Sequence, residues 1–140
     1  MDGQPKDDVQ AGTNYTYSFP IIQRAGTYFY HSHAHHLTAK HVYKGYAGFF
    51  IIEDDEELQY GLPTGVYDIP LLIHDRHSVY QPQFNYAPNM MDRMLGYLGD
   101  VLLVNGTFDA FFEVQKTLYR FRIVNSSNAR VYNFGFSDNS

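Results

Sequence analysis

The sequence predicts an all-β protein of the sandwich type, and three observations carry this prediction. The 140 residues include 13 tyrosines and 11 phenylalanines, and both residue types favour pleated, half-buried surfaces. Several short apolar segments alternate with a period of two residues, which is typical of strands. Glycine, proline and asparagine separate these segments, as expected between the strands of a sandwich.

Three strands are predicted before residue 55. The segment NYTYSF (14–19) alternates and places its aromatic residues on one face. GTYFYHSH (26–33) follows a glycine break, and AGFFIIED (47–54) is a continuous apolar run, typical of a strand buried on both faces. Residues 34–45 lack strand alternation, so we expect a short helical turn or an irregular loop there.

An acidic segment divides the chain. DDEELQYGLPTGVYD (54–68) combines an acidic run with Pro63 and two glycines, which predicts a linker. We expect its acidic residues to lie on a solvated surface. The predicted division is therefore residues 1–55, a linker at 56–67, and residues 68–140.

Four further strands are predicted after the linker, at residues 68–75, 99–106, 118–125 and 129–136. The alternation is most regular in LYRFRIV, where Tyr119, Phe121 and Ile123 point to one face. Arg120 and Arg122 point to the opposite face.

Residues 80–100 form an irregular tract that holds three of the four methionines. Thioethers are soft ligands that suit copper, so a copper-binding methionine patch is one interpretation. Packing into irregular gaps is the other, and we favour it because methionine commonly fills such gaps.

Composition argues against several classes of function. The formal net charge of -5 and the lack of a Lys/Arg cluster argue against a nucleic-acid partner. No apolar run is long enough to span a bilayer. The absence of cysteine excludes disulfides, thiolate zinc sites and cysteine nucleophiles. No phosphate-binding loop, dinucleotide fingerprint or G-x-S-x-G segment occurs.

Five of the seven histidines lie between His31 and His41. Residues two apart in a strand share a face and lie about 6.5–7 Å apart, so His31 and His33 are expected to project in parallel beside Phe29. Two such imidazoles suit two neighbouring metal ions better than chelation of one ion. Imidazole binds copper, zinc, iron and nickel, and a packed or surface role remains the alternative.

The other histidines carry weaker predictions. His35, His36 and His41 leave the strand register, and we favour a surface role for them over a pocket. The segment HDRH (74–77) follows an apolar run. It is either a charge network or an exposed polar strand end, and we favour the exposed end.

The segment GTYFYHSHAHHLTAKHVYKGYAGFFIIED (26–54) resembles the histidine segment that closes the first cupredoxin domain of multicopper oxidases. The resemblance is strongest to the branch of bacterial spore-coat laccases and bilirubin oxidases. LPTGVYDIPLLIHDR, GDVLLVNG and LYRFRIVNSSNARVYNFGF resemble the linker and the first strands of the second domain, so the resemblance covers essentially the whole chain.

The resemblance implies partial cupredoxin-like Greek-key β-sandwiches. Residues 1–55 would be the C-terminal part of the first domain and residues 68–140 the N-terminal part of the second. His31 and His33 would be ligands of the paired type 3 coppers in a trinuclear cluster, one to each copper. The family's H-W-H-G, H-x-x-H-x-H and H-C-H segments are missing from this sequence. MDGQPKDDVQAG (1–12) resembles the stretch that normally follows H-W-H-G, so Met1 is expected to be an internal methionine.

The implied function is that of a laccase-like oxidoreductase, which couples one-electron oxidation of phenolic, pigment or metal-ion substrates to four-electron reduction of O2 to water. Its partners would be O2 and a small reducing substrate, and its location extracytoplasmic, secreted or spore-coat. This chain alone is expected to be inactive, since a type 1 copper needs a thiolate. Two alternatives stay open: a small copper or zinc carrier that uses His31, His33 and either His35 or His36, and a metal-free β-sandwich.

Overall fold

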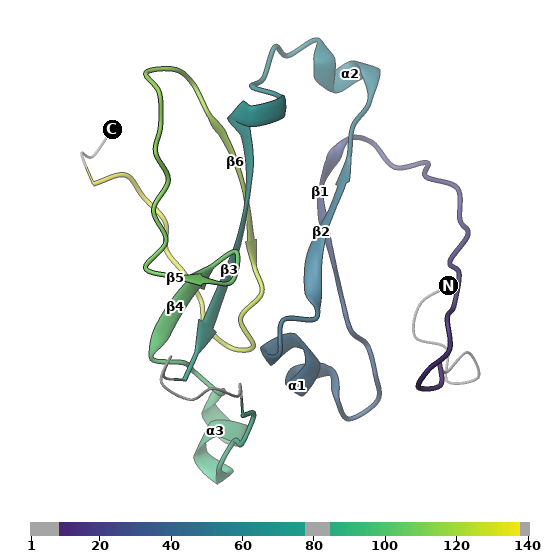
Figure 1. Cartoon of the computed structure of the whole chain (residues 1–140), viewed down its shortest axis with the longest axis vertical. Coiled ribbons are helices and arrows are strands. Elements are labelled where there is room, and N and C mark those ends of the chain that lie inside the picture. Colours follow the sequence, from purple (N-terminus) through teal and green to yellow (C-terminus); the bar gives the residue numbers. More distant parts are fainter. Residues whose placement is uncertain (1–8, 78–84, 138–140) are drawn as a thin grey trace.

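The computed structural model describes residues 9–77 and 85–137, in which strands dominate and helices are short, so the all-β prediction is confirmed. The elements in chain order are β1 (Gly26–His31), α1 (Thr38–Tyr43), β2 (Ala47–Ile52), α2 (Asp55–Leu58), the 3-10 helix η2 (Gly65–Tyr67), β3 (Asp68–Arg76), α3 (Met90–Leu95), β4 (Val101–Val104), β5 (Thr107–Phe108) and β6 (Arg120–Asn125). Figure 1 shows two sheets side by side, with α2 at one end and α1 and α3 at the other. In these described ranges no helix is long and apolar enough to cross a membrane.

β1 and β2 form an antiparallel pair, and α1 lies in the connection between them. The register places Gly26 opposite Ile52 and His31 opposite Ala47, so the strands predicted at 26–33 and 47–54 are confirmed over most of their length. The predicted helical turn is α1. It is followed by Gly45, whose φ of 94° favours glycine and turns the chain back toward β2.

The second sheet is mixed and has the strand order β5-β4-β3-β6. β3 pairs antiparallel with β4 and parallel with β6, so Ile73 lies opposite Val104 on one side and Asn125 on the other. Three of the four strands predicted after the linker are therefore confirmed. The two sheets share no strand, and α2 and η2 lie between them in the sequence. The division into residues 1–55, a linker at 56–67 and residues 68–140 stays a prediction.

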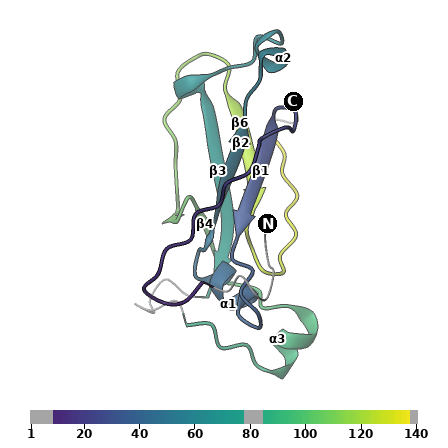
Figure 2. The ribbon, with the colours of Figure 1, turned by 90° about the vertical axis from the view of Figure 1, so that its right-hand side faces the viewer.

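Polar contacts join the two sheets at both ends. Arg122 in β6 donates to Thr27 Oγ1 in β1 at 2.9 Å, near α2. At the other end, Asn128 donates to the carbonyl of Ala39 in α1 at 2.9 Å, and the backbone N–H of His77 donates to the hydroxyl of Tyr43 at 3.0 Å. The view in Figure 2 shows the strands of both sheets running along the long axis between these two ends. The β1–β2 pair is thus fixed against the second sheet.

The apolar core is small and shares its space with charged groups. The buried apolar residues of the described ranges are Tyr43, Ile52, Ile73, Leu103 and Val124. The buried polar and charged residues are His74, Asp75, Arg76, Arg122 and Ser126. Because a buried charge is tolerated only when it is paired or hydrogen-bonded, specific polar contacts matter for this fold.

Two of the predicted strands do not form. Residues 14–19 and 129–136 have no regular secondary structure and belong to neither sheet. Alternation still brings neighbouring rings together: the Tyr15 and Tyr17 centroids are 4.7 Å apart, and those of Tyr132 and Phe134 are 5.8 Å apart. A strand also needs a neighbour for its backbone hydrogen bonds, and the described residues provide none at these two segments.

The burial predicted for β2 was also wrong. Ile52 is buried, but Ile51 on the opposite face is 38% exposed, because the described residues do not cover that face of a two-stranded sheet. In β6 the predicted alternation is confirmed. There the face with Phe121 is exposed and the face with Arg122 is buried.

Candidate metal centre

His31 and His33 lie at the end of β1, and they share one face. His31 is the last residue of the strand. The ring centroids of the two histidines are 6.0 Å apart, with an angle of 37° between the rings, and Phe29 stacks on His31 at 5.8 Å. Both imidazoles are exposed, so a ligand can reach them. The predicted juxtaposition of His31, His33 and Phe29 is therefore confirmed.

The proton of His31 is fixed by the backbone. Its Nδ1 lies 2.9 Å from the carbonyl oxygen of Ser32. A carbonyl oxygen only accepts, so Nδ1 carries the proton and Nε2 of the neutral ring keeps its lone pair. Metal-binding histidines usually have this arrangement, with the second ring nitrogen donating to a carbonyl or carboxylate. The neutral tautomer that this contact favours therefore presents Nε2 to a metal ion.

His41 reaches from α1 to the residue between the two histidines. Its Nδ1 is 2.7 Å from Ser32 Oγ, and its ring packs against Tyr46 with centroids 5.1 Å apart. His41 is half-buried, so it is less exposed than His35 and His36. Nothing in the sequence spacing indicates this contact, because it depends on the path of α1.

His35 and His36 have the surface position that the sequence predicted. Both are exposed, and their ring centroids lie 3.9 Å apart. His36 has a φ of 58°, in the left-handed region that residues other than glycine rarely adopt. The pair extends the exposed histidine surface beyond His33.

The described residues do not complete a metal site. Within residues 9–77 and 85–137, no three His, Cys, Asp or Glu side chains are grouped so that they could hold a metal ion. Protein zinc sites use four protein ligands when structural and three when catalytic. His31 and His33 therefore suit a centre that receives further ligands, and not a closed site within these residues.

The interpretation of residues 74–77 as an exposed strand end was wrong. His74, Asp75 and Arg76 belong to β3 and are 5%, 3% and 5% exposed. Asp75 Oδ2 accepts hydrogen bonds from the backbone of Gly99 at 2.6 Å and from Arg130 Nε at 2.9 Å. Burial alone would raise the pKa of Asp75, but hydrogen bonds involving Ser127, Arg130 and Gly99 hold it below its usual value. The charge network, our less favoured interpretation, is the one that forms.

His74 and Arg76 complete this network against α1. The guanidinium of Arg76 lies 4.7 Å from the centre of the Tyr43 ring, a favourable cation–π contact. His74 Nδ1 is 3.1 Å from Ser126 Oγ. Burial, and secondly the charge of Arg76, lowers the pKa of His74 to about 4. His74 is therefore neutral at physiological pH, and its contacts indicate a structural role.

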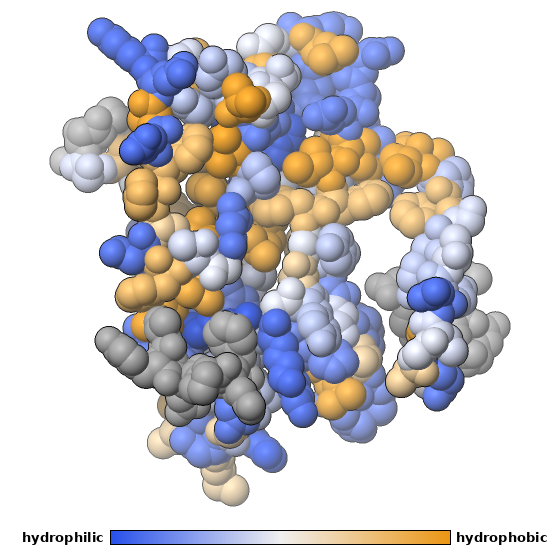
Figure 3. Space-filling view, viewed as in Figure 1, coloured by the Kyte–Doolittle hydropathy of each residue, from blue (hydrophilic) through white to orange (hydrophobic). Residues whose placement is uncertain are grey.

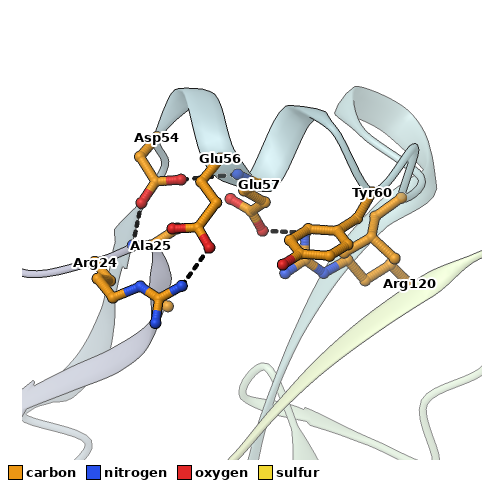
Figure 4. Close-up of a pocket in the computed structure, with 9 residues that line it drawn as sticks. Arg24, Ala25, Asp54, Glu56, Glu57, Tyr60 and Arg120 are labelled. Carbon is orange, nitrogen blue, oxygen red and sulfur yellow. Dashed lines mark hydrogen bonds and ion pairs between the residues drawn. The ribbon is translucent and has the colours of Figure 1, made fainter.

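A pocket of about 230 Å³ lies at the opposite end of the molecule, beside α2 (Figure 4). Two ion pairs, Arg24–Glu56 and Arg120–Glu57, line it. Asp54 accepts hydrogen bonds from the backbone of Ala25 and of Glu57, both at 2.8 Å. These hydrogen bonds lower the pKa of Asp54, and the one from Ala25 has the largest effect. Glu53, Asp55 and Glu56 are exposed, as expected for a solvated acidic run, whereas Asp54 and Glu57 are half-buried. The carboxylates also have local roles, since Asp54 caps α2 and Glu56 and Glu57 pair with arginines.

The methionines of α3 do not fill gaps. Met90, Met91 and Met94 are 81%, 61% and 74% exposed, which contradicts the interpretation that we favoured. The helix begins with a capping box between Asn89 and Asp92, so it is well defined despite its length. The beginning of the predicted tract, residues 80–84, lies outside the described residues.

Comparison with known proteins gives a consistent result. A family model described as multicopper oxidase matches residues 1–57. A laccase of Bacillus subtilis (strain 168) is 36% identical over an alignment of 154 residues. The match covers 98% of this chain and 30% of the laccase. A cell division protein FtsP of Xenorhabdus nematophila is 37% identical over 134 residues, which cover 93% of this chain and 27% of that protein.

Among solved structures, the 2F4 variant of the McoA multicopper oxidase from the hyperthermophile Aquifex aeolicus superposes with a TM-score of 0.80. It is 45% identical, and the match covers 92% of this chain and 29% of McoA. The strands described above are therefore partial cupredoxin-like β-sandwiches, as the resemblance implied. The chain spans about 30% of the length of the relatives that it matches.

Proposed function

The chain belongs to the multicopper oxidase family, and from this premise we propose that it contributes His31 and His33 to the copper centre of a laccase-like oxidase. Each imidazole would bind one copper of the type 3 pair. The remaining ligands would come from outside this chain. Copper is thus the cofactor that we assign, and His31 and His33 are the residues that would hold it.

The geometry of the two imidazoles is the observation that carries the proposal. They are exposed on one face with ring centroids 6.0 Å apart, a separation that lets each ring hold an ion of its own. The hydrogen bond from His31 Nδ1 to the Ser32 carbonyl leaves Nε2 for the metal. Imidazole is a good copper ligand. The absence of a third grouped ligand in the described ranges fits a shared centre better than a self-contained carrier.

When bound, copper would supply the electron transfers that couple oxidation of a phenolic, pigment or metal-ion substrate to four-electron reduction of O2 to water. The residues of this chain would bind and orient. Phe29 stacks on His31 at 5.8 Å and restricts the orientations of its ring. The binding nitrogens must be unprotonated, so acid should compete with copper.

The test uses the full-length protein that carries this sequence. His31→Ala and His33→Ala should each lose copper from the type 3 pair and abolish O2 reduction. The blue type 1 absorption should largely survive, because its thiolate ligand cannot come from this cysteine-free chain. His36→Asn is the matched control, since asparagine tolerates the left-handed backbone at this position. Equal loss of copper in all three variants, measured as metal per protein, would show that the ligand set is wrong.

A cell-division role is the second candidate. Relatives named cell division protein FtsP match this chain about as closely as the laccase of Bacillus subtilis does. The flanking gene sequence separates the two candidates. H-W-H-G upstream and H-C-H downstream would supply the missing copper ligands, whereas a gene without them would favour the second candidate.

Two further expectations belong to the oxidase proposal. The 140-residue chain alone, loaded with copper, should not turn over a phenolic dye above a free-copper control. The full-length oxidase should act outside the cytoplasm, as a secreted or spore-coat protein, which cell fractionation with an antibody can check. Dye turnover by the isolated chain would contradict the shared centre.

A further inference from the structure

Ser32, the residue between the two histidines, is held from three directions. Its backbone N–H donates to the carbonyl of Tyr46 at 3.0 Å. Its carbonyl accepts from His31 Nδ1 at 2.9 Å, and its Oγ is 2.7 Å from His41 Nδ1. The backbone that connects His31 to His33 is therefore tied to α1 and to the start of β2.

His41 is itself well fixed. Its backbone N–H donates to the carbonyl of Leu37 at 2.8 Å, within the first turn of α1, and its carbonyl accepts from Tyr46 at 3.0 Å. The Tyr46 ring lies against the imidazole at 5.1 Å. A half-buried side chain held at the backbone and at the ring presents its Nδ1 to Ser32 in one geometry.

The strand pairing explains why this contact matters. The last paired residues of β1 and β2 are His31 and Ala47, so the sheet ladder positions His31 but not His33. Beyond His31 the direction of the chain depends on the contacts of Ser32. The Ser32–His41 hydrogen bond is the one of these that comes from a side chain of α1.

We propose that His41 is a positioning residue for the histidine pair, and that it acts through Ser32 to fix the orientation of His33 relative to His31. The inference rests on the proposed function, since it concerns how His31 and His33 are held for copper. His41 is bonded to Ser32 and would not be a ligand. Partners that orient metal ligands typically change metal affinity by about 10- to 100-fold, and an effect through one intervening residue is expected near the lower end.

The test measures copper retention by the full-length protein against a competing chelator, at a temperature well below the unfolding midpoint. His41→Leu removes the bond to Ser32, and Ser32→Ala removes it from the other side. Each should lower copper retention about tenfold. His41→Asn places an amide near the position of Nδ1, so it should restore most of the retention. His35→Ala, which removes a neighbouring exposed histidine, is the matched control and should retain copper like the parent.

A double-mutant cycle gives the decisive comparison. His41→Leu and Ser32→Ala both remove the Ser32–His41 hydrogen bond, and Ser32→Ala also removes the long contact of Ser32 Oγ with the backbone N–H of Ala34, at 3.5 Å. The double variant should therefore retain copper as well as Ser32→Ala alone does. Additive losses, or a failure of His41→Asn to restore retention, would overturn the proposal. If His41→Leu does not fold, the comparison of Ser32→Ala with His41→Asn decides, since both substitutions are small.

His31→Ala, measured in parallel, separates this inference from the function on which it rests. Loss of copper by His31→Ala with parental retention in His41→Leu would reject the positioning role alone. Full retention by His31→Ala would reject the ligand assignment itself, and the positioning role with it.

Discussion

Arg122 donates three hydrogen bonds to Asp68, from Nε to both carboxylate oxygens at 2.9 Å and from Nη2 to Oδ2 at 2.7 Å, and this pair connects β6 to the start of β3. The Arg122 side chain is 2% exposed and that of Asp68 is 12% exposed. Arg122 also donates to Thr27 Oγ1 at 2.9 Å, on the strand that carries the histidines. The ion pair therefore links the second sheet to β1.

Replacing Arg122 by leucine should destabilise the protein strongly. Removing one partner of a buried ion pair typically costs roughly 3–5 kcal/mol. Here Arg120 stays 3.8 Å from Asp68, so we expect a loss near the lower end of this range. The shift of the urea unfolding transition of the full-length protein measures this. Arg24→Leu is the control, because the Arg24 side chain in the Arg24–Glu56 pair is 79% exposed and exposed pairs contribute about 0–1 kcal/mol. Equal shifts in the two variants would contradict the importance of the Arg122–Asp68 pair.

Gly99→Ala should also be destabilising, for a steric reason. A Cβ on Gly99 would collide with the backbone N, C and O atoms of Arg76, and a backbone cannot move aside as a flexible side chain does. Forcing an extra methyl into a packed site costs roughly 1–3 kcal/mol or more. Gly135→Ala, where nothing lies within 4 Å of the added Cβ, is the matched control. Thermal unfolding midpoints of the two variants should differ clearly, and similar midpoints would show that β3 accommodates the methyl group.

Local sequence patterns predicted most of the strands. β1, β2, β3, β4 and β6 were predictable because each is a short apolar segment between turn residues. Residues 14–19 and 129–136 show the same pattern and yet form no strand. The alternation of apolar residues indicates which faces a segment can present. Whether the segment forms a strand also depends on pairing with a neighbouring strand that is distant in the sequence. The parallel pairing of β3 with β6 was unpredictable for the same reason.

The charged strand end at residues 74–76 shows a different limit of prediction from sequence. Hydrophobicity alone favours exposure of His-Asp-Arg, but its partners are far away in sequence: Gly99 is 24 residues and Arg130 is 55 residues from Asp75. The His31–His33 pair was predictable, because strand alternation fixes it locally. The contact of Ser32 with His41 was not, since it depends on how α1 folds back on β1.

The buried His74 predicts a pH dependence of stability. Its pKa is lowered to about 4 in the folded protein, whereas an unfolded histidine titrates near 6.5. Between these values the unfolded chain binds more protons than the folded chain, so stability falls as the pH is lowered through this window. From about pH 7 to about pH 5 the loss due to His74 should be roughly 2 kcal/mol.

His74→Asn isolates this effect. Asparagine does not titrate, and its amide can replace the hydrogen bond of His74 Nδ1 with Ser126. Urea unfolding of the full-length protein at the two pH values should show a smaller decrease for this variant than for the parent. Asp75 and Arg76 beside His74, and Tyr43 packed against it from α1, stay unchanged in both proteins. His35→Asn, at an exposed histidine, should behave like the parent; an unchanged decrease in His74→Asn would contradict the assignment.

The chain has a large apolar surface. Its accessible surface is 11,360 Å², whereas a compact monomer of 16.2 kDa exposes only about 7,500 Å². Apolar side chains account for part of the excess: Phe29 is 53% exposed, and Phe121 and Ile123 are each 43% exposed. Figure 3 shows apolar residues gathered over the four-stranded sheet and extending toward the N-terminal segment. Patches of this kind normally contact another protein surface or promote aggregation.

We therefore expect the isolated 140-residue chain to be poorly soluble or loosely packed. Exposed aromatic strands with uncovered edges associate readily, so size-exclusion chromatography should show aggregates and a hydrophobic dye should bind. Copper should not restore a compact state, because two imidazoles provide too little coordination free energy to replace missing packing. A thermal scan of the isolated chain with and without copper checks this. Dye binding by an intact oxidase is the control for dye binding by the isolated chain. A monomeric apo-chain that melts cooperatively and binds no dye would contradict the expectation, and would favour a self-contained metal-binding module over a contribution to a shared centre.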